Sequence, residues 1–417
     1  MLDGLVSDVR VTHRARTSPE SVDLAASGRT RQIARPASAR ATTVGTPEGR
    51  RRIGMIEANK TERLYQLDPC PVNAPLLGCV FAPRRTRRTL RSLTERVTIP
   101  MLRVAMHVLG IDAGGTKTMC LLADEQGRII SEARGGGANL KTAGELGVEK
   151  VLHTVMEEAI GERQIIPSVV CLGMAGADRE ADARTVRAIM RRIGYKAKTL
   201  VVNDALIALV AGAADGPGVA IVTGTGSIVY GRTAGNRAAR AGGWGHLLGD
   251  EGSGFWIGRR ALASVVRAAD GRGPATLLTP RVFARLGIGS ISDLVQLLYD
   301  RDVALPFVAA LGQVVQGARD DGDEVASRIL TQAADELTLA ATSVVTRLEM
   351  TLENFPFVLA GGIFSGVPWL LAELERRLPG LAPRASVRRL HEDPAVGAVH
   401  LALAEARGGA RIPSYIS

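Results

Sequence analysis

The expected strands and helices follow the same order twice along this chain, and that repetition constrains its fold more than any other feature. From His107 onward, short apolar runs separated by tight turns predict three strands, followed by alternating helices and strands. The expected strands cover 107–112, 119–123, 127–132, 168–174 and 198–202, and the expected helices cover about 142–160, 180–193 and a segment from Asp204.

The same order begins again after the turn at 215–218. Three further strands are expected at 219–223, 227–230 and 237–241. Helices then follow at about 254–269, 275–286, 291–299, 306–320 and 323–350, a strand at 357–359, a helix at 367–378, a strand at 385–389 and a last helix from Pro394. The repeat is one of pattern and not of sequence, and it predicts an α/β protein with two lobes, each a mixed sheet flanked by helices.

Residues 1–105 do not share this pattern. They contain 19 Lys/Arg and 9 Asp/Glu, a balance of 19 − 9 = +10, which is the whole excess of the chain because 52 − 42 = +10. We predict that this Arg-rich segment is disordered. Three explanations remain open: a start site chosen too early, since Met101 and Met106 precede the first strand, a solvated tail, or a targeting or nucleic-acid-binding arm.

The four cysteines, Cys70, Cys79, Cys120 and Cys171, are too few and too irregularly spaced for a disulfide scaffold or a zinc knuckle. No run approaches the roughly 18 uncharged apolar residues of a membrane span, and no signal peptide is recognisable. We therefore expect a cytoplasmic protein. Residues 106–417 have no net charge, so neither a nucleic-acid nor a membrane partner is expected for them.

A glycine hairpin at Gly110–Thr118 is the first chemical signal. It nearly spells a Walker phosphate loop, but Thr116 occupies the lysine position and a strand follows instead of a helix. Asp112 ends one strand, and the glycines allow backbone N–H groups to approach an anion. This arrangement suits a terminal phosphate with hydrated magnesium, although an ordinary hairpin turn has the same sequence.

Two further glycine turns occupy matching positions. Thr223–Ser227 opens the second half in the way that the first hairpin opens the first half, so the two turns are expected to grip one nucleotide from opposite sides. Gly361 and Gly362 follow a later strand, where backbone passes close to a flat adenine or a ribose, or where a helix packs on a strand.

Three such turns in this order resemble the sugar kinase/Hsp70/actin superfamily, and a long block narrows the resemblance. Residues 242–258, with 203–205 and 224–227, look like the N-acetylglucosamine kinase branch grouped with the BadF/BadG/BcrA/BcrD ATPases. The resemblance covers about 106–410. It implies the two-lobe actin-like (ribonuclease H-like) ATPase fold, with a first lobe at 106–217 completed by a terminal helix in 394–417, a second lobe at 218–393, and a homodimer.

The resemblance also implies residue roles. ATP phosphates would contact the two hairpins, the adenosine would contact the later turn, Mg²⁺ would be held through water by Asp112, and the sugar would contact the long block and 139–140. By this resemblance the nucleotide residues are Asp112, Gly114, Gly115, Thr116, Lys117, Thr118, Gly224, Thr225, Gly226, Ser227, Gly361 and Gly362, and the sugar residues are Asn139, Leu140, Asp204, Gly243, Trp244, Gly245 and Asp250.

Asp204 falls at the position of the catalytic base. Phosphoryl transfer needs one carboxylate that aligns the acceptor hydroxyl and takes its proton. Because Asp204 ends an expected strand and begins a helix, it suits that role, but an Asp there is also a common helix N-cap. Asp250 and Glu251 suit adjacent sugar hydroxyls or simply a solvated loop, and Trp256 is expected in the core.

The function expected from these features is an ATP- and Mg²⁺-dependent kinase that phosphorylates N-acetyl-D-glucosamine at its 6-hydroxyl. A glucosamine or muramyl-sugar kinase is the nearest alternative. A second alternative is the ATPase activator type of the same branch, which carries an iron–sulfur cluster. It needs cysteines at a subunit interface, whereas Cys120 and Cys171 fall inside expected strands and suit small core positions.

Overall fold

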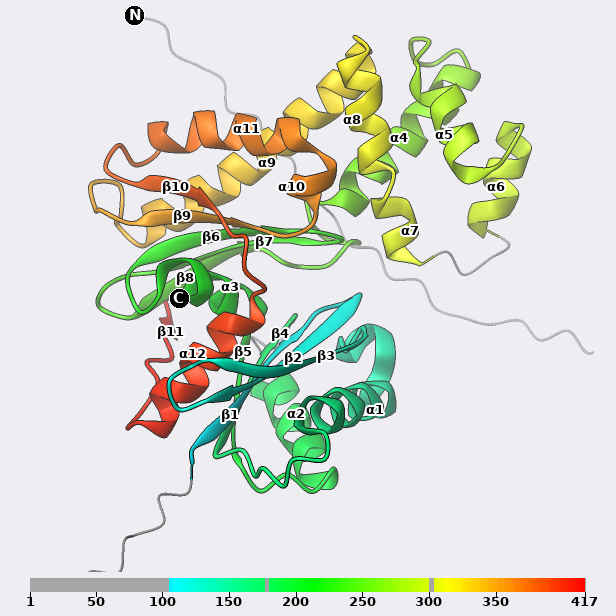
Figure 1. Ribbon diagram of the computed structural model, residues 1–417. Coiled ribbons are helices and arrows are strands. Elements are labelled where there is room, and N and C mark those ends of the chain that lie inside the picture. Colours follow the sequence, from blue (N-terminus) through cyan, green and yellow to red (C-terminus); the bar gives the residue numbers. More distant parts are fainter. Residues whose placement is uncertain (1–104, 177–179, 300–303, 417) are drawn as a thin grey trace, which may run out of the picture. The chain divides into compact units, whose positions relative to one another are not determined.

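A computed structural model describes residues 105–176, 180–299 and 304–416. The expected extension, 1–105, therefore lies almost wholly outside the described residues. Figure 1 shows two sheets, one formed by the first half of the described chain and one by the second, each flanked by helices. Both halves belong to one compact unit of the chain, Glu95–Ser417.

The first sheet has the strand order β3-β2-β1-β4-β5. Its first three strands form an antiparallel meander, and β4 and β5 run parallel to β1. The elements are β1 (His107–Ala113), β2 (Lys117–Asp124), β3 (Ile129–Gly136), α1 (Leu140–Ile160), β4 (Val169–Met174), α2 (Glu180–Arg192), β5 (Lys198–Asn203) and α3 (Asp204–Ala213).

The second sheet, β10-β9-β6-β7-β8-β11, repeats this arrangement with one added edge strand. Its strands are β6 (Gly218–Thr223), β7 (Ser227–Arg232), β8 (Arg237–Gly242), β9 (Pro356–Ala360), β10 (Ser386–Arg389) and β11 (Ser414–Tyr415). The repeated order of strands was predictable because apolar runs and turn residues are local signals.

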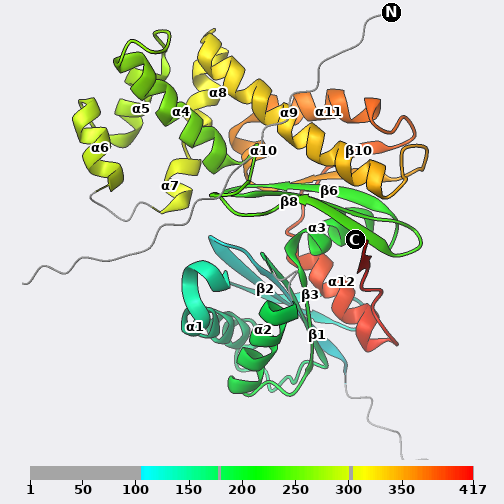
Figure 2. The same ribbon diagram turned by 180° about the vertical axis from the view of Figure 1, so that it is seen from behind.

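Helices fill the long connection between β8 and β9 and follow the last strands. They are α4 (Gly254–Ala269), α5 (Leu278–Leu286), α6 (Ile291–Tyr299), α7 (Leu305–Ala309), α8 (Gly312–Asp320), α9 (Glu324–Arg347), α10 (Ile363–Gly366), α11 (Pro368–Arg377), a 3₁₀ turn at Leu378–Gly380, and α12 (Ala395–Ala406). Figures 1 and 2 show α9 and α11 on one face of the second sheet, with α3 on the other.

Several boundaries differ from the sequence-based expectations. The single helix expected at 306–320 is two helices, α7 and α8. The helix expected from 142 begins at Leu140 and is broken at Gly144, whose φ of 66° and ψ of 171° are not helical. Strand β3 extends to Gly136, because its pairing with β2 continues to Lys117, which pairs with Gly136.

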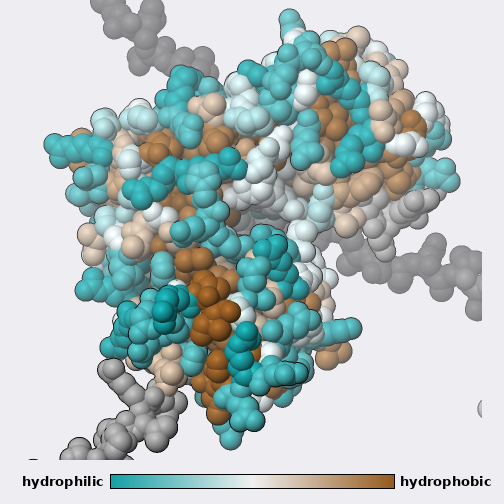
Figure 3. Space-filling view, in the orientation of Figure 1, coloured by the Kyte–Doolittle hydropathy of each residue, from teal (hydrophilic) through white to brown (hydrophobic). Residues whose placement is uncertain are grey.

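Three apolar clusters hold these elements together. One lies between the first sheet and α1 and α2, and another between the second sheet and α4, α9 and α11. The third combines side chains of both sheets with those of α3 and α12. In addition, Figure 3 shows a band of apolar side chains at the surface over the first sheet.

The last helix packs onto the first half of the described chain at backbone distance. A Cβ atom on Gly397 of α12 would lie 1.9 Å from the carbonyl oxygen of Ile207 in α3, and one on Gly110 of β1 would lie 2.4 Å from the nitrogen of Val399. Glycine is required at such crossings because no side chain fits. The residues after α12 leave this sheet, since β11 pairs with β8. The terminal segment 394–417 thus does not serve the first lobe alone.

No single helix among the described residues is long and apolar enough to cross a membrane, although α5 and α6, bent by 51° at their junction, together match the length and composition of a span.

Candidate active site

The first glycine hairpin joins β1 to β2 and leaves three consecutive residues, Gly115, Thr116 and Lys117, exposed at its tip. The turn is closed by the Gly114 N–H, which donates to the Lys117 carbonyl at 3.0 Å. The end of β3 presses against this tip, since a Cβ on Gly137 would lie 2.2 Å from the Gly115 oxygen. The hairpin is therefore held in place while its tip remains accessible to a ligand.

Thr118 has a different place from the one expected. Its side chain is 1% exposed, and its hydroxyl donates to the Gly136 carbonyl oxygen at 2.7 Å. This bond fastens β3 to β2, so the hydroxyl is not available to donate to a phosphate. Ser227 of the second hairpin behaves in the same way: it is 8% exposed, and its hydroxyl donates to the Glu251 carbonyl at 2.7 Å.

The two hairpins meet through their threonines. The hydroxyls of Thr116 and Thr225 lie 3.3 Å apart, although 109 residues separate them in the chain. The start of α4 supports the second hairpin, because the Gly254 N–H donates to Gly224 O at 2.8 Å and the Phe255 N–H donates to Thr225 O at 3.3 Å. The exposed tip of the first hairpin and the half-buried tip of the second thus meet at their hydroxyl groups, as an anion site between them requires.

Gly361 and Gly362 follow β9 beside the second hairpin. Gly361 has a φ of 114°, and a Cβ there would lie 2.0 Å from the Thr223 carbonyl oxygen, whereas a Cβ on Gly362 would meet nothing within 4 Å. The first glycine is therefore required for the close approach of β9 to β6. Gly362, by contrast, borders open space next to the ends of these two strands.

Asp204 is the first residue of α3, and its neighbour takes the capping role. Asn203 is the N-cap and accepts from the Ala205 N–H at 2.7 Å. The alternative that Asp204 is only the N-cap is thus wrong, because Asn203 occupies the N-cap position, for which Asn and Asp are about equally suitable. Asp204 itself is partly buried and also accepts from the Ala205 N–H, at 2.9 Å.

At this end of the first sheet, the charges of two carboxylates, Asp204 and Asp393, act on a third, Asp112. The pKa of Asp112 is raised to about 7, first by burial and then by the charges of Asp204 and Asp393, while the charge of Lys117 lowers it. Asp393 was not expected from the sequence. Its position in the sequence could have indicated it, because Asp393 stands between an expected strand and an expected helix, as Asp204 does earlier in the chain.

These groups fit a hydrated magnesium ion. Among the described residues no three His, Cys, Asp or Glu side chains lie close enough to hold a metal ion by themselves. Mg²⁺ at a nucleotide site characteristically keeps several waters and uses one or two carboxylates together with the phosphates. A half-buried carboxylate such as Asp112, with Asp204 and Asp393 near it, is a suitable partner for that water shell.

The residues expected to hold a sugar lie on two loops. Asn139 caps the short first turn of α1, accepting from the Lys141 N–H at 2.9 Å, and the preceding Ala138 N–H donates to Gly114 of the first hairpin at 3.0 Å. Because Gly144 interrupts the helix, Asn139 and Leu140 belong to a separate turn that lies against the first glycine hairpin.

The second loop follows β8. Gly243 and Gly245 have φ values of 71° and 88°, and Trp244 between them is 55% exposed, with the Arg240 guanidinium 4.2 Å from its ring centre. Asp250 accepts from the Gly245 N–H at 3.3 Å.

Asp250 is 9% exposed, so the interpretation as a solvated surface acid is wrong for it. Burial raises its pKa, against hydrogen bonds from the backbone of Ser227 and Gly245. Trp256 is 4% exposed, which confirms its expected core position.

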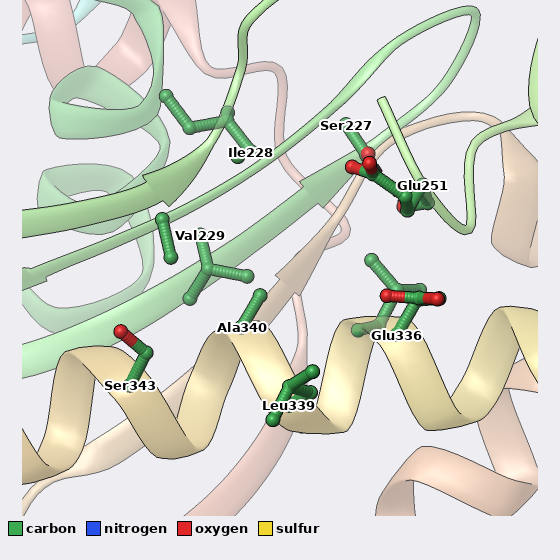
Figure 4. A pocket seen from close by; sticks show the side chains of 11 residues that line it. Ser227, Ile228, Val229, Glu251, Glu336, Leu339, Ala340 and Ser343 are labelled. Atoms are coloured by element: carbon green, nitrogen blue, oxygen red, sulfur yellow. Dashed lines mark hydrogen bonds between the residues drawn. The ribbon is translucent and has the colours of Figure 1, made fainter. Parts of the chain in front are cut away.

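A cavity of about 260 Å³ lies behind the second hairpin, between β7, β8 and α9. Figure 4 shows Ser227 and Glu251 side by side at one end, with Glu336, Leu339 and Ser343 along the helix. Its lining includes neither Asp112 nor Asp204. The cavity therefore borders the second glycine hairpin from behind and is separate from these two carboxylates.

One comparison with known proteins decides the family. The sequence profile of the BadF/BadG/BcrA/BcrD ATPases matches residues 109–402, which is more than half of the chain. The chain belongs to the BadF/BadG/BcrA/BcrD ATPase family. Membership of an ATPase family implies that the chain uses ATP.

Two curated relatives in this family carry kinase names. The chain is 36% identical over 302 residues to an N-acetylmuramic acid/N-acetylglucosamine kinase of Clostridium acetobutylicum, an alignment that covers 72% of this chain and 99% of the relative. It is 32% identical over 309 residues to an N-acetyl-D-glucosamine kinase of Dictyostelium discoideum, covering 71% and 97%.

A solved structure shows the same fold. A proposed N-acetylglucosamine kinase from Chromobacterium violaceum superposes with a TM-score of 0.56 at 26% identity, covering 72% of this chain and 99% of the other. The expected two-lobe actin-like fold of mixed sheets flanked by helices is thereby confirmed for the described residues.

A prediction follows from the raised pKa of Asp112. The unfolded carboxyl ionises near its ordinary 3.8 and the folded one near 7. Between these values the folded chain holds the extra proton, so this group's contribution to stability falls as pH rises and levels off above about 7. We expect Asp112→Asn to stabilise the magnesium-free, ligand-free protein by up to about 4 kcal/mol at pH 8 and by much less near pH 4.5.

Urea unfolding at both pH values, in the presence of a chelator, measures this difference. Glu132→Gln, which alters an exposed carboxylate in β3, is the comparison variant. A gain for Asp112→Asn that is the same at both pH values would contradict the prediction.

Proposed function

We propose that this protein is an ATP-dependent amino-sugar kinase, with N-acetyl-D-glucosamine as the first acceptor to test. One observation carries the proposal: the Thr116 and Thr225 hydroxyls bring the two glycine hairpins together at the edge where Asp112 and Asp204 interact. A phosphate site and a candidate base thus share one location. The kinase names of the curated relatives support the choice of an amino sugar.

The residues divide the work as follows. Backbone N–H groups of the two hairpin tips and the Thr116 and Thr225 hydroxyls would bind the ATP phosphates, and Lys117 would add positive charge. Mg²⁺, held through water by Asp112, would neutralise charge on the transferring phosphoryl group. Gly361 and Gly362 would border the adenosine.

Asp204 would act directly on the acceptor. Its carboxylate would align the sugar 6-hydroxyl and accept its proton as the new oxygen–phosphorus bond forms and the bond to ADP breaks. Asn139, Leu140, Gly243, Trp244, Gly245 and Asp250 would hold the sugar so that this hydroxyl faces the γ-phosphate. Positioning of this kind supplies much of the rate of phosphoryl transfer.

Two alternatives lead to different experiments. A glucosamine or muramyl-sugar kinase would share the entire phosphate site and differ only in the sugar pocket. The activator type is disfavoured by the described cysteines: Cys120 and Cys171 are both fully buried, and burial raises the pKa of Cys120 to about 12. Such inert thiols are unsuited to holding a cluster at a subunit interface.

The test is ADP release with Mg²⁺ and ATP against a panel of N-acetylglucosamine, glucosamine, N-acetylmuramic acid and glucose. We expect release that depends on the sugar and is greatest for an N-acetylated amino sugar. ADP release that is absent or independent of sugar across the panel would reject the kinase. The homodimer implied by the resemblance remains a proposal, for which light scattering of the purified protein is the direct measurement.

A further inference from the structure

An ion pair connects the phosphate hairpin to the start of the last helix. Lys117, the first residue of β2, lies with its Nζ 3.4 Å from Oδ2 of Asp393, which is 276 residues away in the sequence. Asp393 lies two residues before the start of α12, the helix that packs on β1 and α3. The contact therefore joins a residue at the expected ATP phosphates to a helix on which the first sheet depends.

The two partners are held very differently. The Lys117 side chain is 69% exposed, whereas that of Asp393 is 23% exposed. Asp393 also accepts, through Oδ1, from the Ala395 N–H at 3.1 Å. A lysine ammonium on a flexible four-carbon stem moves readily. The aspartate is thus fixed and the lysine can exchange its partner.

The position of Asp393 indicates what the other partner is. Its charge reaches Asp112, as the raised pKa of that carboxyl shows, and Lys117 adjoins the exposed tip of the hairpin. The phosphates of a bound nucleoside triphosphate would carry several negative charges within reach of the same ammonium. Asp393 and the nucleotide would therefore compete for Lys117.

We propose that Asp393 is a positioning residue for the nucleotide: it holds Lys117 while the phosphate site is empty, and Lys117 exchanges from Asp393 to the phosphates when ATP binds. This inference rests on the proposed function only in placing ATP phosphates at the first hairpin. Because the ion pair must be given up on binding, Asp393 lowers the affinity for ATP. It also favours return of Lys117 when the nucleotide leaves.

The exchange is measurable without any sugar. Titration calorimetry with a non-hydrolysable ATP analogue and Mg²⁺ would compare the full-length protein with Asp393→Asn, Lys117→Met and the double variant. Asparagine still accepts from the Ala395 N–H, so the start of α12 is preserved. We expect Asp393→Asn to bind the analogue about two- to fivefold more tightly, as the loss of one exposed ion pair allows. Lys117→Met should bind it more weakly.

The double variant distinguishes exchange from simple repulsion. If Asp393 acts through Lys117, adding Asp393→Asn to Lys117→Met changes the affinity by less than about 1.5-fold. An equal gain with and without the lysine would overturn the proposal, because the aspartate would then act by its own charge. Weaker binding by Asp393→Asn would also overturn it, because the aspartate would then hold Lys117 in its productive position.

Glu392→Gln is the matched control, since it removes the same charge from the adjacent, exposed residue. We expect it to leave the affinity unchanged, and a gain equal to that of Asp393→Asn would contradict the proposal. Asp393→Ser, which keeps a capping oxygen, should reproduce the gain if Asp393→Asn folds poorly. A failure of the kinase proposal would appear in the sugar panel, whereas these binding ratios do not depend on any acceptor.

Discussion

Asp204→Asn is expected to lower sugar-dependent ADP formation about a thousandfold while the protein keeps its fold. The substitution removes the carboxylate that would accept the hydroxyl proton, a role usually worth 10²- to 10⁴-fold in rate. The amide oxygen still accepts from the Ala205 N–H, and Asn203 still caps α3. Steady-state kinetics with the preferred sugar of the panel measures kcat, and thermal unfolding checks the fold.

The comparison variant for this prediction is Asp215→Asn, which changes an exposed acid just beyond the other end of α3. Its kcat should match that of the unaltered protein. The affinity for the ATP analogue should also survive in Asp204→Asn, because the hairpin tips are untouched. If Asp204→Asn kept more than a tenth of the activity, Asp204 would not be the base.

Substituting either of the two neighbouring glycines after β9 by alanine should affect the stability of the fold very differently. Gly361→Ala would place a Cβ 2.0 Å from the Thr223 carbonyl oxygen, at a φ of 114° that L-residues rarely adopt. The ends of β9 and β6 must then separate. We expect a loss of about 2 to 4 kcal/mol in the free energy of unfolding, together with a loss of ATP-analogue binding at the adjoining hairpin.

Gly362→Ala is the matched control, since its φ of −70° is helical and open space surrounds the new methyl group. Its stability should change by less than about 0.5 kcal/mol. Chemical denaturation and analogue titration of both variants give the comparison. Equal stability of the two variants would show that β9 tolerates the displacement, contrary to the close approach at Gly361.

The repeated strand order could be predicted because it depends on local sequence patterns. Which side chains are free to bind a ligand depends instead on tertiary contacts between residues far apart in the sequence. Thr118 and Ser227 looked like phosphate ligands because they are hydroxyl residues in glycine turns. Their hydroxyls instead bind carbonyl oxygens of Gly136 and Glu251, which no local pattern specifies. A motif identifies the turn but not the direction in which each side chain points.

Asp393 shows the opposite kind of error. It was overlooked because a lone Asp before Pro394 resembles an ordinary helix start, and its significance comes from a partner 276 residues away. Likewise, Asn203 and Asp204 are equally suitable caps by sequence, and only the hydrogen bonds assign the cap to Asn203. The break at Gly144 was missed because a glycine inside a helical pattern is usually tolerated.

The packing of α12 on β1 and α3 has a consequence for synthesis of the chain. The ribosome completes Ile207 about 190 residues before Gly397, whose backbone lies against it. During that interval one face of the first sheet lacks its covering helix, although domains otherwise tend to fold as units from the N-terminus during translation. The first sheet is therefore expected to acquire full protease resistance only after the last helix has left the exit tunnel.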